Sequence, residues 1–328
     1  MERNRSISSV RFIAMIFIVL SHLFQYYSSF PFLIFNIGVQ LFFIISGILY
    51  GNKLVSNYKE WFKKRFKKVL IPYYLYVIIS ALALLIVNDY SVLKEIWKYL
   101  LILPGVFSSS IVLGNLWFVT IIVICYLMLP LLQRFDFSKN RAPVFYLKLL
   151  LVLLVLLVLE YITGLYKFTS NLFCFISAYY FTRRYTYFKL EAGLLLSIFK
   201  RFLIILTPLV FVYYIYYIPS NEGVSFLLLI PKYLAPFALG ITLYNLLHYL
   251  FSDPKLPRAI NRLLEKCVTY SDKYSYYIYL THHLFILTNL SLMALTPYMP
   301  LNITLVIAAF LAYSYVLSLL TKKVTKLI

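Results

Sequence analysis

Two residues that can do chemistry stand inside the first apolar segment, RFIAMIFIVLSH: Arg11 and His22. The residues between them are apolar apart from Ser21. In a helix, eleven steps of about 100° and about 1.5 Å return to nearly the same face, roughly 16 Å further along. Ionisable groups in an apolar helix are costly and usually face a functional interior, so this pair is the first candidate site.

Acid–base chemistry beside an anion suits such a pair. An imidazole is the side chain best placed to take a proton from a hydroxyl at neutral pH. A guanidinium binds phosphate through directed, charge-assisted hydrogen bonds. Two ordinary explanations also fit: Arg11 extends to the inner headgroups as an orientation signal, and His22 is a structural hydrogen-bonding residue.

A second group of cations precedes the third apolar segment, in the sequence KKRFKKVLIPYY. Arg65 and Lys68 are three residues apart and therefore share a helical face, with Lys64 beside them. These side chains suit the phosphates of an anionic cofactor. A charge run that only sets the topology of the chain fits them equally.

The elements that must position these residues are membrane helices. Of 328 residues, 62% are hydrophobic and 13% are charged, whereas a soluble domain carries about twice that charged fraction. Apolar runs of bilayer-spanning length recur along the whole chain. We predict an all-α polytopic membrane protein with ten transmembrane helices, near residues 7–27, 31–50, 69–88, 112–133, 145–162, 168–182, 202–218, 225–248, 274–296 and 301–320.

Two segments are expected to be irregular. Residues 88–114 join an amphipathic piece to a Pro-Gly break, which predicts an interfacial helix or a re-entrant element on the outer side. Pro231 and Pro236 predict either a broken helix or a tolerated kink. Cys125 and Cys174 fall in apolar runs and are expected to be buried small hydrophobes; neither a disulfide framework nor a metal site is indicated.

The net charge of +20 is distributed asymmetrically over the predicted loops. With a cytoplasmic N-terminus, almost all clusters of Lys and Arg fall on the inner side, as the positive-inside rule requires. Both termini are therefore predicted to be cytoplasmic. The charge is chiefly a topology signal, with some contribution to binding membrane lipids or anionic cofactors, and it does not indicate a nucleic-acid partner.

Five short patterns in order along the chain resemble the acyltransferase 3 family of integral membrane acyltransferases, many of which O-acetylate surface glycans. The first is the Arg and His of the first segment, separated by ten residues. The others are matched by Gly38, Val39, Phe42, Phe43, Ser46 and Gly47, then Arg65, Lys68 and Pro72, then Leu116, Trp117, Phe118, Tyr126 and Pro130, and last Ser275, Ile278, Tyr279, Leu280 and His282.

The chain departs from the family pattern at two positions. Many members carry an acid where Gln40 stands and an arginine where Lys68 stands. Lysine keeps the charge but lacks the fork that binds phosphate with two hydrogen bonds, so we expect Lys68 to act as a point charge. Some members also carry a C-terminal extracytoplasmic domain, whereas we expect residues 1–328 to form a single membrane domain.

The resemblance implies transfer of an acetyl group from cytoplasmic acetyl-CoA, which is a substrate and not a resident cofactor, to a hydroxyl of a cell-surface or exported glycan or of a lipid-linked glycan. His22 is then the general base. Arg11, Arg65, Lys68 and Lys64 bind the donor's phosphates. Roughly 16 Å along the helix is comparable to a pantetheine arm, so Arg11 can hold the donor while the thioester reaches His22.

Further candidates lie outside the first segment and the cation group. His282 matches the late histidine of the family and is a secondary site residue, whereas His283 and His248 are expected at interfaces or solvated edges. Trp117 lines a substrate cavity or belongs to the interfacial aromatic belt. Glu160 contacts a polyhydroxylated acceptor or is an ordinary boundary residue.

Alternative functions also fit this sequence. The acyl group could be succinyl, and the acceptor a small molecule. A transporter or flippase of lipid-linked glycans would share the topology and the intramembrane charges, although no paired repeats are visible. A non-catalytic subunit of a glycan-synthesis complex is a further alternative. The composition, rich in Lys, Ile, Tyr and Phe, suits a bacterial plasma membrane protein encoded by an AT-rich genome; the oligomeric state cannot be predicted from this sequence.

Overall fold

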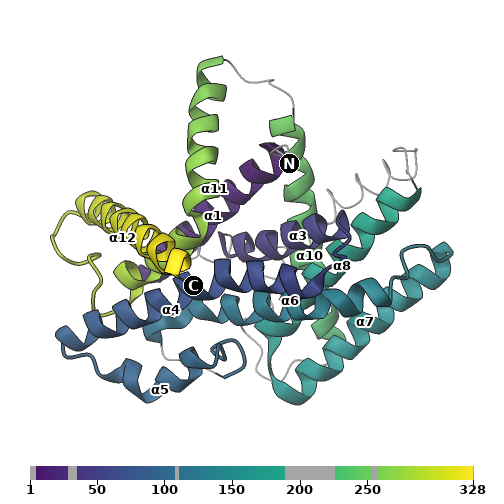
Figure 1. Ribbon diagram of the computed structural model, residues 1–328, viewed down its shortest axis with the longest axis horizontal. Helices are drawn as coiled ribbons and strands as arrows, with labels where there is room; N and C mark the ends of the chain where they lie inside the picture. The colour runs from purple at the N-terminus through teal and green to yellow at the C-terminus, as the bar shows by residue number, and fades with distance from the viewer. Residues whose placement is uncertain (1–4, 29–34, 108–110, 189–225, 253–257, 328) are drawn as a thin grey trace. The chain divides into compact units, whose positions relative to one another are not determined.

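The computed structural model describes residues 5–28, 35–107, 111–188, 226–252 and 258–327, and the secondary structure within these ranges is helical (Figure 1). No strand occurs among them, which confirms the all-α class. The helices are α1 (Arg5–Tyr26), α3 (Ile37–Gly51), α4 (Tyr58–Ile86), α5 (Ser91–Leu100), the 3-10 helix η1 (Ile111–Leu116), α6 (Trp117–Arg134), α7 (Ala142–Thr163), α8 (Tyr166–Phe188), α10 (Phe226–Ser252), α11 (Arg258–Leu287) and α12 (Met299–Leu327).

Five helical segments in the described ranges are long and apolar enough to cross a bilayer: Ile7–Tyr26, Tyr58–Ile86, Val112–Arg134, Ala142–Thr163 and Met299–Leu327. They correspond to five of the ten predicted spans. The predicted span at 31–50 is the shorter apolar helix α3. The predicted spans at 168–182 and 225–248 lie in α8 and α10, and the one at 202–218 lies outside the described residues.

Helix α7 illustrates the distribution of buried and exposed apolar residues on a predicted membrane span. Its buried residues recur at helical spacing from Phe145 through Leu149 and Leu153 to Leu156. The opposite side is equally apolar but exposed, including Val155. A helix that is apolar on both faces and buried on one fits a protein surrounded by lipid.

Two predicted boundaries differ from the structure, and one open alternative is decided. Helix α4 begins at Tyr58, because the Asn57 side chain caps it by accepting a hydrogen bond from the Glu60 amide at 3.1 Å. Helix α11 ends at Leu287 and not at residue 296. Just after this end, the Thr288 hydroxyl donates to the Leu284 carbonyl oxygen and accepts a hydrogen bond from the Leu290 amide, in place of the helical pattern. Helix α10 continues across both of its prolines, so the break considered from the sequence does not occur.

The chain folds into two compact units. The first contains Met1–Ala14, Ile37–Leu54 and Ile124–Arg258, and the second contains Met15–Asn36, Val55–Val123 and Ala259–Ile328. Two of the boundaries between the units fall inside α1 and α6, so each of these helices contributes residues to both units. The single-domain organisation stays a prediction.

In the first unit, α3 and α8 approach closely through glycines. A Cβ added at Gly47 would lie 2.9 Å from the Ala178 Cβ, and one at Gly51 would lie 2.7 Å from the Tyr179 carbonyl oxygen. The contacts advance together along both helices, so the two run parallel. The small residues of α3 therefore allow the two helices to pack closely.

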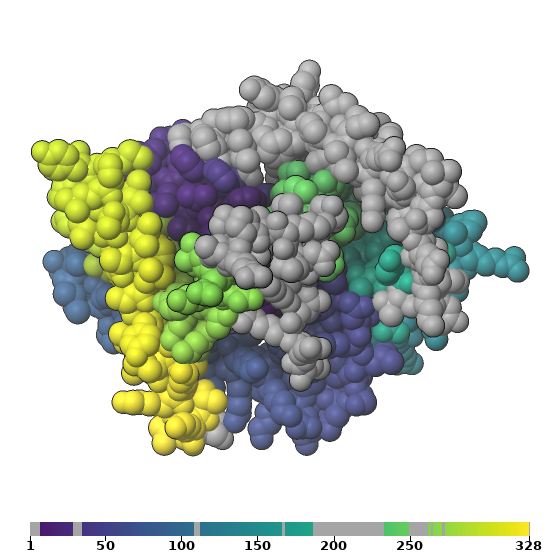
Figure 2. Space-filling model, turned by 90° about the horizontal axis from the view of Figure 1, so that it is seen from above, coloured from purple at the N-terminus to yellow at the C-terminus, as the bar shows by residue number. Residues whose placement is uncertain are grey.

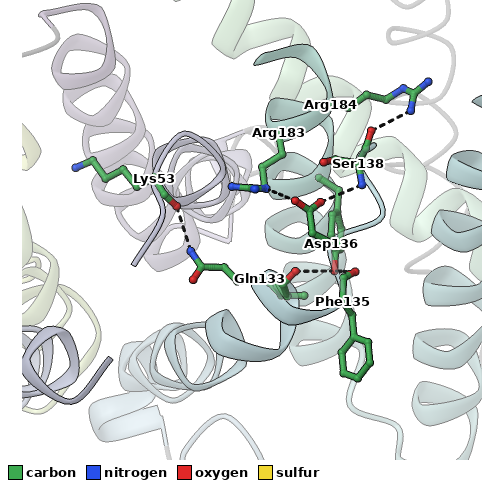
Figure 3. A network of polar contacts seen from close by, with 9 residues as sticks. Lys53, Gln133, Phe135, Asp136, Ser138, Arg183 and Arg184 are labelled. Atoms are coloured by element: carbon green, nitrogen blue, oxygen red, sulfur yellow. Dashed lines mark hydrogen bonds and ion pairs between the residues drawn. The ribbon is translucent and has the colours of Figure 1, made fainter. Parts of the chain in front are cut away.

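A polar network ties α8 to the turn between α6 and α7 in this unit (Figure 3). Arg183 Nε donates to Asp136 Oδ2 at 2.7 Å, and Arg184 donates to the carbonyl oxygens of Ser138 and Asn140 at 3.1 and 2.8 Å. The end of α8 thereby binds the turn between α6 and α7. Although burial opposes it, hydrogen bonds from Ser138 and Arg183 lower the pKa of the Asp136 carboxyl.

In the second unit, α4 packs along α12, and α5 lies against α4. The Tyr73 hydroxyl donates to the Tyr99 carbonyl oxygen at 2.7 Å, which ties α4 to α5. The predicted amphipathic piece is therefore a helix that is bound to α4. Helix α12 (yellow in Figure 2) lies at the surface of the face shown. Apolar side chains such as Val316 and Leu319 are exposed on it.

Candidate active site

Helix α1 carries both residues of the first predicted pair. It runs unbroken from Arg5 to Tyr26, so Arg11 and His22 lie on one helical stripe, as their spacing predicts. Arg11 is half-buried and follows Val10, which clusters with Ile45 in the first unit. His22 is half-buried in the second unit.

Three histidine rings meet in the second unit. The ring centroids of His282 and His283 each lie 5.1 Å from that of His22, with interplanar angles of 38° and 87°. His22 comes from α1 and the other two from α11. The structure therefore brings His22 together with the late histidine that the sequence analysis selected.

Hydrogen bonds orient two of these rings. His22 Nδ1 lies 3.0 Å from Gln25 Oε1, and His282 Nδ1 lies 3.0 Å from the Ile278 carbonyl oxygen. Carbonyl oxygens only accept hydrogen bonds, so each neutral ring carries its proton on Nδ1 and its lone pair on Nε2.

Both histidines of α11 are buried, His282 fully and His283 with 3% of its surface exposed. Among the described residues, His282 Nε2 and His283 Nδ1 have no hydrogen-bond partner. Buried polar atoms of this kind normally pair with water or a ligand. The expectation that His283 lies at an interface or solvated edge is wrong, because every residue from Ile278 to Leu284 is covered by neighbouring elements.

Asn115 supports the cluster and was missed by the sequence analysis. Its Nδ2 donates to the carbonyl oxygens of Tyr279 and Leu280 at 3.0 and 3.1 Å, and the Tyr279 hydroxyl donates to the Asn115 carbonyl oxygen. These bonds fix the end of η1 against α11, one turn before the two histidines. A buried amide in an otherwise apolar run was the signal available in the sequence.

Two further bonds hold α11 in place. The Thr281 hydroxyl lies 2.7 Å from the Ser314 hydroxyl of α12, and the Tyr276 hydroxyl donates to the Val69 carbonyl oxygen of α4 at 3.0 Å. Helix α11 is therefore bonded to α4, η1 and α12 close to His282. A helix that is held rigidly by its neighbours keeps its side chains in a fixed geometry, as catalysis requires.

The predicted donor-binding cations lie on the first turns of α4. Arg65 is half-buried, with its Cζ 6.0 Å from the centroid of the Trp61 ring. Lys64 Nζ pairs with Glu60 Oε1 at 2.6 Å and is largely exposed, and Lys68 is exposed. Of these three side chains, Arg65 is the one whose head is held by packing.

Trp117 and Glu160 occupy different units. Trp117 opens α6 in the second unit, half-buried, and its carbonyl oxygen would lie 2.8 Å from a Cβ added at Gly105. Glu160 lies in the first unit near the end of α7, with 6% exposure, and its Oε2 has no hydrogen-bond partner among the described residues. An ordinary boundary residue would be exposed, as its neighbour Tyr161 is at 73%.

An acidic residue outside the spans ties the end of α11 to the rest of the second unit. Asp89 accepts hydrogen bonds from the Ser91 hydroxyl at 2.5 Å and from Asn289 Nδ2 at 2.8 Å. The bond from Ser91 lowers the pKa of the Asp89 carboxyl, burial opposes this, and Asn289 lowers it further.

The arrangement in the second unit can perform general base catalysis. It offers a half-buried imidazole whose lone pair is on Nε2, beside two buried imidazoles on a braced helix. Within the described ranges, no group of three or more His, Cys, Asp or Glu side chains has a geometry that could hold a metal ion.

Comparison with known proteins adds one match. The family model described as an acyltransferase domain matches residues 4–321, which is nearly the whole chain. No curated protein and no solved structure shows significant similarity to the chain.

Proposed function

Because the chain belongs to the acyltransferase 3 family and is a membrane acyltransferase, we propose that it is an O-acetyltransferase with His22 as its general base. The acetyl group comes from acetyl-CoA, and the acceptor is a hydroxyl of a cell-surface or exported glycan or of its lipid-linked precursor. The observation that carries the proposal is the contact of His22 with His282 and His283 in the second unit.

The reaction needs a base and a position for the thioester. His22 Nε2 takes the proton of the acceptor hydroxyl while the hydroxyl oxygen attacks the thioester carbon. The C–O bond forms, the C–S bond breaks, and the protonated ring returns its proton to the leaving thiolate. One residue can therefore serve both halves of the transfer without a metal ion.

In this proposal, Arg65, Lys68 and Lys64 of the second unit bind the phosphates of the donor, and Arg11 of α1 is a separate candidate for the same role. The half-buried guanidinium of Arg65 supplies directed hydrogen bonds, and the exposed Lys68 and Lys64 supply long-range attraction. Arg11 lies roughly 16 Å along α1 from His22, a distance that suits an extended pantetheine arm.

For the acceptor, Trp117 in the second unit and Glu160 in the first unit are two separate candidates. An indole ring stacks on the apolar face of a sugar, and a buried carboxylate oxygen without a partner accepts hydrogen bonds from sugar hydroxyls. His282 serves as a secondary residue of the site beside His22.

The topology we propose has ten spans with both termini in the cytoplasm of a bacterial cell, and the protein lies in the plasma membrane. The distribution of Lys and Arg over the loops supports this orientation. It places Arg11 near the inner surface, where acetyl-CoA is available, and His22 nearer the outer surface.

One experiment separates this proposal from its rivals. Purified protein in liposomes receives acetyl-CoA with a labelled acetyl group, together with a panel of glycan and small hydroxyl acceptors, and the products are identified by mass. The proposal expects an acetyl ester whose formation requires His22. Succinyl transfer from succinyl-CoA, without acetyl transfer, would show that the acyl group is succinyl. Transport of a lipid-linked glycan without consumption of the thioester would contradict the proposal.

A further inference from the structure

We propose that Gln25 and His282 are positioning residues that prepare His22 for proton transfer. Gln25 fixes which ring nitrogen of His22 is basic, and His282 accepts a hydrogen bond from that nitrogen once it is protonated. This inference rests on the proposed role of His22 and adds the residues that make the ring an effective base.

Gln25 lies one turn after His22 in the last turn of α1, so its side chain reaches the ring from the same helix. Its Oε1 lies 3.0 Å from His22 Nδ1. A neutral amide oxygen selects the ring form with a proton on Nδ1, and it does so without adding a charge to an apolar helix. The lone pair is thereby directed to Nε2, the nitrogen on the other side of the ring.

His282 is prepared for the complementary role. Its Nδ1 is bonded to the Ile278 carbonyl oxygen at 3.0 Å, so its own lone pair also stands on Nε2. That atom is fully buried and has no hydrogen-bond partner among the described residues. Two titratable rings among the described residues contact His22, those of His282 and His283, both from α11.

Two rings with unprotonated Nε2 atoms cannot hydrogen-bond to each other at rest. When His22 Nε2 takes the proton of the acceptor hydroxyl, it becomes a donor, and the lone pair of His282 Nε2 becomes its acceptor. The positive charge is then stabilised by a neutral buried partner until the proton passes to the thiolate. The number of protons is unchanged over the cycle.

The role of Gln25 is tested without reference to turnover. In protein labelled with ¹⁵N-histidine, the ring nitrogen shifts of His22 report which nitrogen carries the proton. We expect Gln25→Ala to abolish the preference for a proton on Nδ1, and Gln25→Glu to retain it. Tyr27→Phe, which removes an exposed hydroxyl at the same end of α1, is the matched control and keeps the wild-type spectrum.

Turnover gives the second readout. Gln25→Ala lowers kcat about tenfold, the scale expected for the loss of an orienting partner. Gln25→Glu keeps most of the rate and moves the acid limb of the pH–rate profile to higher pH, because a carboxylate favours the protonated ring. A Gln25→Ala protein with the wild-type ring spectrum and the wild-type profile would overturn this assignment.

His282→Phe tests the other partner, since phenylalanine fills a similar buried space without a lone pair. We expect the tautomer of His22 to be unchanged, kcat to fall about tenfold, and the acid limb to move to lower pH. An unchanged profile in a folded His282→Phe protein contradicts the role. If His22→Ala itself retained full activity, the proposed function would fail, while the ring spectrum of Gln25→Ala would still decide the Gln25 contact.

Discussion

The environment of the His22 ring is formed by one residue close in the sequence and two that are distant. Gln25 is supplied by the same helix and orients the ring, whereas His282 and His283 come from α11 and enclose it. Arg65 also has a partner that positions it, because its guanidinium packs against Trp61, and this distinguishes it from the neighbouring cations. The residue types identify these positions as candidates for the site. The contacts in the structure indicate which candidates are held in place.

Arg65→Ala is expected to raise the KM for acetyl-CoA about tenfold with little change in kcat, the effect of one lost charge-assisted hydrogen bond to phosphate. Lys64→Ala is the comparison variant, because Lys64 is assigned to the donor only through long-range attraction. Lys64 is already paired with Glu60 and its side chain is 71% exposed, so its removal changes KM by about twofold or less. Equal effects of both substitutions on KM, measured by initial rates, would contradict the ranking.

At the scale of elements, close helix contacts and short polar bonds hold each unit together. Glycines let α3 approach α8 in the first unit. Asn115, Thr281 and Tyr276 bind α11 to η1, α12 and α4 in the second unit. Changes at these contacts are expected to alter stability before they alter chemistry.

Gly47→Ala introduces a methyl group against Ala178 and the backbone of α8. We expect the free energy of unfolding to fall by about 2 kcal/mol, the cost of overpacking a tight contact. Gly114→Ala is the control, because a Cβ there meets its nearest neighbour, His283 Nε2, at 3.8 Å. Thermal unfolding in detergent measures both, and equal midpoints would show that α3 and α8 do not pack this closely.

The Asp89 carboxyl makes stability depend on pH. Its pKa is lowered in the folded protein, so its contribution is fully present above the ordinary value of about 3.9 and is lost as pH falls through the folded pKa. We expect the unfolding midpoint of the wild type to drop below about pH 4 more steeply than that of Asp89→Asn. Parallel curves for the two proteins would contradict this assignment.

At the scale of the whole molecule, the sequence predicts the helical class and the membrane environment because both depend on composition and run length. Five spans, the shared stripe of Arg11 and His22, and the buried cysteines follow from local pattern. The burial of His283, the support from Asn115 and the end of α11 at Leu287 do not. These depend on which helices cover α11 and on side chains that compete for backbone groups.

The charge distribution makes a prediction at this scale. Both termini are expected on the cytoplasmic side, because Lys and Arg gather on the loops that share that side. Protease digestion of terminal tags in intact cells, right-side-out vesicles and inverted vesicles measures this. Tags protected in cells and cleaved in inverted vesicles agree with the topology, whereas cleavage of one tag in intact cells would require an odd number of spans.

The role of His22 is tested most directly by the rate of labelled acetyl transfer in liposomes for two histidine variants at a fixed acceptor. His22→Ala is expected to lose about 10²–10⁴-fold in rate, the usual contribution of a positioned base. His248→Ala, which removes a histidine stacked on Tyr244 in the first unit, is expected to keep the wild-type rate. Equal rates for His22→Ala and the wild type would contradict the assignment of His22 as the base.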